Sequence, residues 1–168
     1  MSTKPTNFGV RLPVAGPLAT PESIVRTAQA ADQLGFDIAW VHDYITWNEK
    51  LDSVHISCGS KASFVNAVES PGYTPVFYES ITNLAFLAGI TNNIRLGAAV
   101  LILPYREALV TAKQLACVDS LSGGRLELGI GQGAIKSTFN TENEVMNISR
   151  MTKVKHTREV FEAMCEVW

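Results

Sequence analysis

Hydrophobic positions along the chain alternate between short apolar runs and longer segments in which apolar residues recur every three or four positions. The run at 36–41 is nearly continuous, as is typical of a parallel strand covered on both faces. Each run is followed by a helical segment long enough for a right-handed crossover. The pattern therefore predicts an α/β fold built of parallel (βα) units, with strands at 7–13, 36–41, 94–103 and 125–130.

Two of the helices carry signals at their ends. Thr20 is a natural N-cap, Pro21 occupies the first helical position and Gly35 supplies the stop, so a helix is predicted between them. Thr74 and Pro75 repeat the cap-then-proline signal and predict the start of a second helix. That helix is expected to bury one apolar face and to end at a glycine: Phe77, Ile81, Leu84 and Ala88, then Gly89.

The last two helices are predicted from apolar spacing. Cys117 and Cys165 fall within these two patterns, so both are expected in the core. With Cys58 they form an odd, widely spaced set of three, which favours free thiols in a reducing compartment over disulfides. The expected apolar faces are Leu109, Ala112, Leu115 and Ala116 in the helix that breaks at 122–124, and Val160, Phe161, Met164 and Trp168 in the last helix.

Composition is that of an ordinary globular protein, and the length suits a single domain over residues 1–168. A formal net charge of -2 supplies no basic field for DNA or RNA, so no nucleic-acid partner is expected. No stretch approaches the roughly 20 apolar residues of a membrane span, and residues 1–10 lack the apolar core of a signal peptide. We therefore expect a cytoplasmic protein that does not bind membranes.

In parallel α/β folds, ligands bind at the carboxyl ends of the strands. The segment LSGGRLELGIGQG at 121–133 is the most informative, because a predicted strand lies between two glycine clusters. Gly131 and Gly133 would let backbone N–H groups approach a ligand, although they also suit a plain tight turn. No helix follows them directly as in a dinucleotide fingerprint, which disfavours an open Rossmann-like nucleotide binder.

The second predicted strand ends at His42 and Asp43, ahead of a long connection at 42–74 without convincing periodicity. One of the two side chains would act in proton transfer or hold a cofactor edge; alternatively, both are solvated loop residues. His55 and Cys58 are spaced like two metal ligands, but zinc sites need three or four protein ligands, so no metal is expected. Aromatic residues nearby either wall a flat ligand or pack onto the fold: Tyr44, Trp47, Phe64 and Tyr73.

Two blocks, LGFDIAWVHDY at 34–44 and NNIRLGAAVLILPYREALVTAKQLACVDSLSGGRLELGIGQG at 92–133, resemble the bacterial luciferase-like monooxygenases and their deazaflavin-dependent relatives. The linked motifs RLG, LP-R and LSGGR are specific together. The resemblance implies a TIM barrel that binds FMN or coenzyme F-420, with the ring at the C-terminal ends of the strands. It also implies hydride transfer to or from that ring, with oxygen activation in the monooxygenase branch and a small-molecule substrate.

The resemblance further implies roles for individual residues. A strand-three bulge, often with a non-proline cis peptide, falls at 99–100, and Asp43 matches the aspartate of the family's Asp-His pair. Tyr44 stands at the histidine position and Ala134 stands where deazaflavin dehydrogenases have glutamate, which counts against the proton-transfer role of the sugar-phosphate dehydrogenase branch. The implied catalytic residues are His42, Asp43 and Tyr44, and the implied cofactor-binding residues are Ala98, Ala99, Val100, Gln132, Gly133 and Ala134.

A TIM barrel has eight βα units, and this chain supplies four, so the resemblance covers a four-strand half-barrel. The first and fourth strands are then expected to be unpaired edges, with one sheet face uncovered. We expect a second barrel half or a homo-oligomer to complete the fold, unless the chain is a truncated product without full activity. The alternative to an incomplete flavin- or deazaflavin-dependent oxidoreductase is a non-catalytic half-barrel that dimerises and serves a structural or regulatory role.

Overall fold

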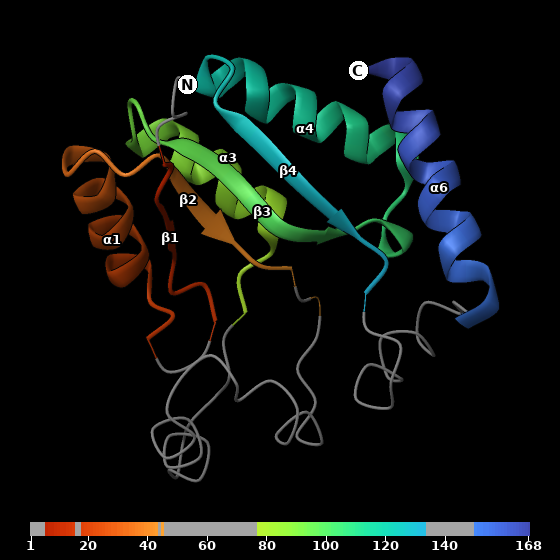
Figure 1. The fold of residues 1–168 in the computed structure, drawn as a ribbon, viewed down its shortest axis with the longest axis horizontal. Coiled ribbons are helices and arrows are strands. Elements are labelled where there is room, and N and C mark those ends of the chain that lie inside the picture. The colour runs from red at the N-terminus through yellow and green to blue at the C-terminus, as the bar shows by residue number, and fades with distance from the viewer. Residues whose placement is uncertain (1–5, 16–17, 44, 46–76, 134–149) are drawn as a thin grey trace, which may run out of the picture.

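A computed structural model describes residues 6–15, 18–43, 45, 77–133 and 150–168 of the chain. Its centre is a parallel sheet in the order β1-β2-β3-β4 (Figure 1). The predicted α/β fold of parallel (βα) units is confirmed, and β1 and β4 are the edges of the sheet in the described part of the chain. The strands are β1 (Gly9–Arg11), β2 (Ile38–Val41), β3 (Arg95–Ile102) and β4 (Leu126–Gly131).

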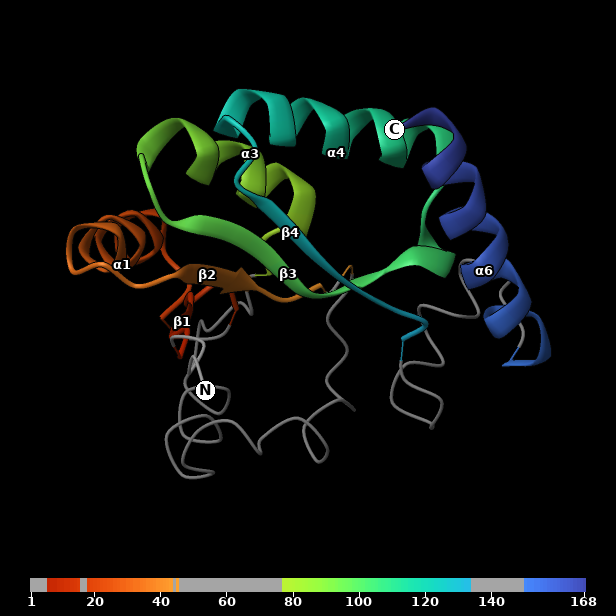
Figure 2. The ribbon, with the colours of Figure 1, turned by 45° about the horizontal axis from the view of Figure 1, so that its top comes forward.

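Helices α1 (Pro21–Gln33), α3 (Ser80–Ile90) and α4 (Ala108–Ser122) lie on one face of the sheet, as Figures 1 and 2 show. A 3-10 turn, η3 (Leu103–Tyr105), directly follows β3. The last helix, α6 (Arg150–Val167), packs against α4 and η3. None of the described helices is long and apolar enough to cross a bilayer. The core between helices and sheet is built around fully buried leucines: Leu84, Leu87, Leu96, Leu101 and Leu115.

The ends of α1 are as predicted. The Thr20 hydroxyl accepts a hydrogen bond from the Ser23 amide at 3.1 Å, and Pro21 is the first helical residue. After the C-cap residue Leu34, Gly35 adopts φ +79°, a left-handed conformation that glycine allows without a steric penalty. Local capping chemistry was therefore sufficient to define this helix.

The predicted start of the second helix at Thr74 and Pro75 is wrong. Thr74 and Pro75 lie outside the described residues, and α3 begins only at Ser80. Its N-cap is Glu79, whose carboxylate accepts hydrogen bonds from the Ile81 and Thr82 amides at 3.2 and 2.7 Å. A carboxylate replaces the expected threonine because it satisfies two free amides at once and its negative charge suits a helix N-terminus.

The remaining predictions for this helix are also corrected. Phe77, expected on its apolar face, forms an isolated antiparallel bridge with Ala15. Gly89, expected to end the helix, lies inside it, and Thr91 is the C-cap residue. The tertiary pairing of Phe77 with a residue far earlier in the chain overrides the local helical spacing.

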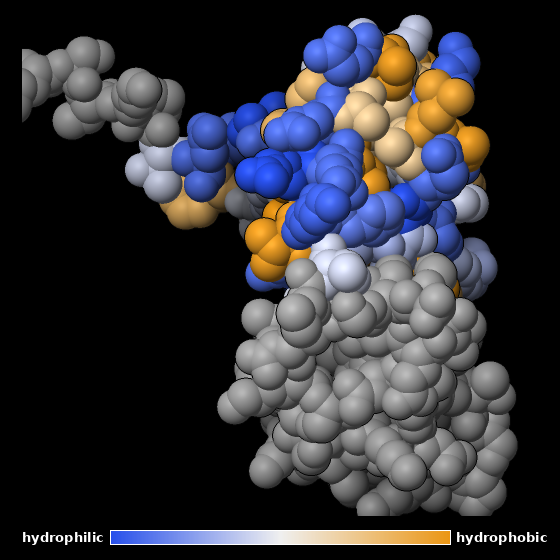
Figure 3. Space-filling view, turned by 90° about the vertical axis from the view of Figure 1, so that its right-hand side faces the viewer, coloured by the Kyte–Doolittle hydropathy of each residue, from blue (hydrophilic) through white to orange (hydrophobic). Residues whose placement is uncertain are grey.

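Several residues expected in the core of the last two helices are exposed. Leu109 is 63% exposed, and Phe161 and Trp168 are about half exposed. Cys117 and Cys165 are exposed free thiols, so the core placement predicted for them is wrong. In α6, which packs against α4 and η3, a narrow stripe centred on Val160 and Met164 is buried. In α4, the buried face is formed by Ala112, Leu115 and Val118, which leaves Leu109 and Cys117 on the exposed side. Figure 3 shows the face bearing α6, where hydrophobic side chains are interspersed with hydrophilic ones.

The face of the sheet opposite the helices carries Trp40. Its neighbours Ala39 and Val41 belong to the core on the helix side, so Trp40 points the other way. The indole lies against Gly9 and Gly97, because a Cβ added to either glycine would come within 2.5 Å of the ring. No helix in the described part of the chain covers this inner face (Figure 2). We call the surface around Trp40 the inner face of the sheet.

Arg125, just before β4, joins the ends of two helices. Its guanidinium donates hydrogen bonds to the carbonyl oxygens of Ala88 and Thr91 in α3 and its cap, and to the carbonyl of Ser122 at the end of α4. It also donates to the Ile94 carbonyl ahead of β3 at 2.8 Å. Carbonyls at helix C-termini lack partners within the helix. The arginine of LSGGR therefore stabilises the fold at the amino ends of the strands, away from their carboxyl ends.

Candidate functional site

Strand β3 bulges where it faces β4. Ala98 pairs with Leu128 and Leu101 pairs with Ile130, so Ala99 and Val100 stand opposite the single residue between those partners. The Ala99–Val100 peptide bond is cis. The bulge and the cis peptide lie where the family resemblance implied them. The backbone of β3 thus leaves the regular ladder within two residues of the strand's carboxyl end.

Glycines in β4 let this bulge lie close to the sheet. A Cβ on Gly131 would stand 2.6 Å from Cγ2 of Val100, and one on Gly129 would stand 2.9 Å from the carbonyl oxygen of Ala98. Val100 therefore lies over the glycines of β4 on the inner face, and it remains 43% exposed. Gly133 has φ +75°, a conformation that favours glycine, and the preceding Gln132 is half-buried.

At the carboxyl end of β2, His42 contacts Arg11 of β1. Nε of Arg11 donates to Nδ1 of His42 at 3.4 Å, and Nη2 of Arg11 lies 3.5 Å from Nε2 of the same ring. Both contacts are long, so they orient the imidazole only weakly. His42 is half-buried at this edge of the sheet, in the position predicted from the sequence.

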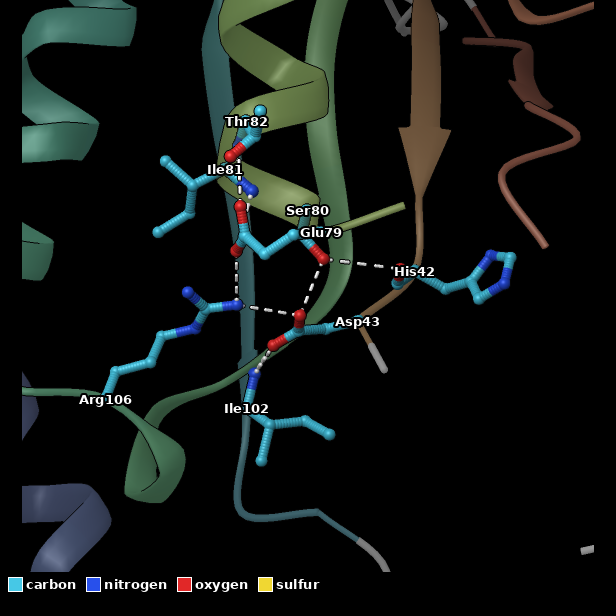
Figure 4. A network of polar contacts seen from close by, with 8 residues as sticks. All are labelled: His42, Asp43, Glu79, Ser80, Ile81, Thr82, Ile102 and Arg106. Carbon is cyan, nitrogen blue, oxygen red and sulfur yellow. Dashed lines mark hydrogen bonds and ion pairs between the residues drawn. The ribbon is translucent and has the colours of Figure 1, made fainter. Parts of the chain in front are cut away.

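Asp43 is the centre of a buried polar network at the same edge (Figure 4). Its Oδ1 accepts hydrogen bonds from Oγ of Ser80 and Nη2 of Arg106, both at 2.7 Å. Its Oδ2 accepts from the Ile102 amide at 2.9 Å. The side chain of Asp43 has no exposed surface. One carboxylate therefore ties the end of β2 to the end of β3, to the start of α3 and to the residue after η3.

Arg106 connects Asp43 to a second carboxylate. Its Nη2 lies 2.8 Å from Oε1 of Glu79, the N-cap of α3. Burial on its own would raise the pKa of Glu79, but hydrogen bonds from Thr82 and Ile81 and the Arg106 charge lower that pKa below its usual value. Nε of Arg106 is buried without a hydrogen-bond partner among the described residues. Two acidic groups and one arginine thus share a single ion-pair network.

The model of the luciferase-like monooxygenase family matches residues 5–168 of this sequence. The chain belongs to the luciferase-like monooxygenase family. The resemblance seen in the sequence motifs is therefore confirmed. The four parallel strands correspond to part of a luciferase-like TIM barrel. In TIM barrels generally, active sites lie at the carboxyl ends of the strands.

Known relatives of this luciferase-like chain include flavin enzymes. It is 31% identical over 86 residues to the oxygenase component of the flavin-dependent trigonelline monooxygenase of Acinetobacter baylyi, a match to 51% of this chain and 23% of the relative. It is similar to the oxygenating constituent of 3,6-diketocamphane monooxygenase from Pseudomonas putida, solved in complex with FMN, with a TM-score of 0.67 and 17% identity over 96% of this chain and 39% of that one.

A deazaflavin enzyme has the same fold. The coenzyme F-420-dependent tetrahydromethanopterin reductase from Methanopyrus kandleri aligns with a TM-score of 0.56 and 22% identity, covering 91% of this chain and 38% of that one. Relatives of the luciferase-like chain thus include both flavin-dependent monooxygenases and F-420-dependent reductases. The chain spans less than half the length of each of these proteins.

The structure brings most of the predicted site residues to the side of the sheet where the carboxyl ends of its strands lie. His42 and Asp43 follow β2, Val100 lies on the bulge with Ala98 and Ala99, and Gln132 and Gly133 follow β4. Tyr44 and Ala134 lie outside the described residues, as do His55 and Cys58. Within the described ranges, no three His, Cys, Asp or Glu side chains are grouped so as to hold a metal ion.

Sequence reasoning missed three members of the Asp43 network: Glu79, Ser80 and Arg106. One signal for Arg106 was present, because the motif LP-R is among those that carry the family resemblance. Glu79 and Ser80 carried no such signal, since the sequence placed them inside a predicted helix and away from a strand end. The contacts that give these residues a role join segments far apart in the chain, such as Arg106 with Asp43.

The described residues at this edge fit a flat ring with polar edges. Val100 offers exposed apolar surface on the inner face. The bulge at Ala99 and Val100 has backbone groups that stand outside the regular pairing with β4. Gly131 and Gly133 bring backbone close without side chains in the way. Apolar walls with a few directed polar groups are the usual lining of small-molecule sites.

Proposed function

We propose that this chain supplies one wall of the cofactor site of a flavin- or deazaflavin-dependent oxidoreductase. The proposal is carried by one observation: the β3 bulge lies directly against the glycine-rich end of β4, with Val100 exposed above it. Membership of the luciferase-like family supports it, as does the FMN bound to the related Pseudomonas putida enzyme. FMN or coenzyme F-420 would supply hydride transfer, and FMN would also supply the oxygen chemistry of a monooxygenase.

The residues proposed to hold the ring come from two neighbouring strands. Ala98, Ala99 and Val100 would stand behind its face, and Gln132 and Gly133 would meet its edge. We propose Ala134 as a further contact on the basis of the family pattern. Backbone groups on adjacent strands are held rigidly by the sheet, so they suit the task of orienting a ring.

His42 is the residue of the β2 corner that we propose to exchange a proton with substrate. Imidazole is suited to this task near neutral pH, and His42 stands at the strand edge beside Arg11. Asp43 has its oxygen atoms engaged by Ser80, Arg106 and Ile102, which supports a positioning role for it. Tyr44, which follows Asp43, is proposed as a further substrate contact at the same corner.

A second barrel half or a second copy of the chain is the proposed partner. Support comes from the edge strand β1, whose outer side adjoins a groove of about 790 Å³ between β1 and α1. The inner face beside Trp40 also lacks a covering helix in the described part of the chain (Figure 2). Unpaired strand edges are normally covered or paired.

We propose that the protein acts on a small molecule in the cytoplasm.

Titration of the purified protein with FMN and with coenzyme F-420 tests the proposal. One of the two cofactors is expected to bind stoichiometrically, with a change in its visible absorption. Val100→Glu should weaken that binding at least tenfold, because a charge would replace the apolar surface behind the ring. The matched control is Val154→Glu, the same substitution at a valine of α6 that is 65% exposed. A protein that binds neither cofactor would instead support the non-catalytic half-barrel.

A further inference from the structure

The described α-helices follow one another along the outer layer in the order α1, α3, α4 and α6, because each member of this series packs against the next. Helix α1 therefore stands beside the edge strand β1, and α6 stands beyond α4 on the side of β4 (Figure 1). We call β1 with α1 the β1 end of the half-barrel, and β4 with α6 the β4 end. The two ends differ in structure, so one end can fit the other.

Apolar side chains gather in solvent at the β1 end. The groove between β1 and α1, of about 790 Å³, has an apolar lining that includes Val10, Leu18, Leu34 and Phe36. Leu18 and Leu34 are 70% and 75% exposed, and Phe36 is exposed as well. Grouped apolar side chains on a protein surface mark interaction sites, whereas single ones need no explanation. The β1 end therefore offers a hollow surface suited to large apolar side chains of a partner.

The β4 end carries exposed aromatic side chains on α6. Phe161 lies within α6 and Trp168 directly follows it, and both are about half exposed. They are seven residues apart, close to two helical turns, so they lie on the same side of the helix. Figure 3 shows exposed hydrophobic side chains on this face of the molecule. Aromatic residues contribute much of the binding energy of protein interfaces, so α6 presents the kind of side chain that the groove at the β1 end fits.

The two ends also carry opposite charges on the inner face. Arg11 of β1 is in register with Trp40, and Gly97 links Trp40 to Glu127 of β4, so Arg11 and Glu127 lie in one row of the sheet. Their neighbours along each strand pack on the core, so both side chains point to the inner face. Glu127 accepts a hydrogen bond from Arg95 at 2.6 Å, and its side chain is still 44% exposed. A β1 end that meets a β4 end therefore brings opposite charges to one seam, whereas two β1 ends would bring two arginines together.

We propose that the β4 end of one copy of this chain docks on the β1 end of a second copy, with Phe161 and Trp168 seated against the groove between β1 and α1. Two copies form this contact twice, and the four strands of each then make the eight of a TIM barrel. Strand β4 of one copy pairs with β1 of the other, which removes both unpaired edges. The inference rests on the proposed function, in which a second half or a second copy completes the barrel, and it commits to the second copy.

Sedimentation velocity of the chain without cofactor tests the inference, and the natural protein should be a dimer. Phe161→Glu at the β4 end and Leu34→Arg at the β1 end should each raise the dissociation constant at least tenfold, because each would bury a charge in the seam. The matched control is Phe86→Glu, the same substitution at a phenylalanine of α3 that is 48% exposed in the middle of the layer, and it should leave the dimer unchanged. An equimolar mixture of the Phe161→Glu and Leu34→Arg chains should associate more tightly than either variant alone, since one seam is then natural and the other has opposite charges.

A monomeric natural chain overturns the inference, as do assemblies larger than a dimer. A dimer that is weakened by Phe86→Glu but not by Phe161→Glu would place the contact on α3, and a mixture no tighter than its components would rule out contact between unlike ends. FMN titration is scored separately: a monomer that binds FMN overturns the inference and keeps the proposed function, whereas a dimer that binds neither FMN nor coenzyme F-420 does the reverse. Should either variant not fold, Trp168→Glu and Leu18→Arg take their places.

Discussion

Trp40 and Gly97 touch across β2 and β3: a Cβ built on Gly97 would lie 2.5 Å from Cζ3 of the indole. The other side of the ring meets Gly9 of β1 equally closely. The Trp40 indole therefore fills this layer of the inner face. The two neighbouring strands contribute glycines to it, which have only a hydrogen atom as side chain. TIM-barrel interiors are filled by such layers of side chains. The two glycines are requirements of packing around Trp40.

Gly97→Ala should lower the free energy of unfolding by about 1–3 kcal/mol, because the added methyl group overpacks the inner face. The cost should shrink in a Trp40→Leu background, since the clash partner is gone. Gly89→Ala is the matched control: nothing lies within 4 Å of its added Cβ, so it should be neutral or mildly stabilising. Urea unfolding measures all four variants, and equal costs in both backgrounds would contradict the packing explanation.

Asp43→Asn should destabilise the protein by about 3 kcal/mol, because it removes the buried partner of Arg106 and leaves the partly exposed Glu79 carboxylate to compensate the arginine charge. The double variant Asp43→Asn, Arg106→Met should lose less than the sum of the single losses. Glu22→Gln serves as the control, because Glu22 and Arg26 form an exposed pair at 3.6 Å, for which less than about 0.5 kcal/mol is expected. Strictly additive losses in denaturant titrations would show that Asp43 and Arg106 are not coupled.

Arg125→Lys should cost about 1–3 kcal/mol, although the charge is kept. The flat guanidinium serves carbonyls of Ala88, Thr91 and Ser122 at once, and a single ammonium cannot reach all of them. Arg26→Lys, at an exposed position of α1, should have no measurable effect. Thermal unfolding followed by circular dichroism compares the two variants, and a similar midpoint for both would refute the role assigned to Arg125.

Low pH should reduce the folding stability of the protein, in part by protonating Asp32. Its carboxylate accepts hydrogen bonds from the amides of Asn92, Asn93 and Ile94 at 2.7, 2.9 and 2.8 Å. Burial alone would raise the pKa of Asp32, but these hydrogen bonds and the Arg125 charge lower it below 3.8. A carboxyl whose pKa is lower in the folded chain stabilises it fully above about pH 3.8, and that contribution is lost as pH falls through the folded value.

The measurement is the urea midpoint from about pH 7 to about pH 3, for the natural protein and for Asp32→Asn. The variant should be less stable near neutral pH, and the difference between the two proteins should narrow below about pH 3.8. A difference that stays constant over the whole range would mean that ionisation of Asp32 contributes nothing to stability.

The order of strands and helices followed from apolar periodicity, because each strand and helix buries a face that its own residues define. Thr20 precedes α1 and Gly35 follows it as predicted, since capping residues act within one turn of the helix. The start of α3 was missed because a glutamate, Glu79, caps this helix where a threonine was expected, and Glu79 also pairs with Arg106, a partner remote in sequence. Cys117 and Cys165 were misplaced because spacing predicts that a helix has an apolar face but not how much of it a neighbour covers.

At the candidate site, strand ends were predictable because parallel strands bring their carboxyl ends to one edge. This rule pointed to His42 and Asp43 after β2 and to Gln132 and Gly133 after β4. It did not indicate that Asp43 would be enclosed by Ser80 and Arg106, since Ser80 comes from the start of α3 and Arg106 from the end of η3, both remote from Asp43 in sequence. Periodicity was equally unable to predict that Lys153 of α6 is only 3% exposed, because it treats a lysine on a helix as solvated.

Both ends of the segment between Asp43 and Phe77 are fastened to the sheet layer by contacts already described: Asp43 through its three donors, and Phe77 through its bridge to Ala15. The point at which the chain leaves β2 and the point at which it rejoins the layer ahead of α3 are therefore each held by a residue from another part of the chain. An exchange of the intervening residues between relatives should accordingly keep Asp43 and Phe77 unchanged.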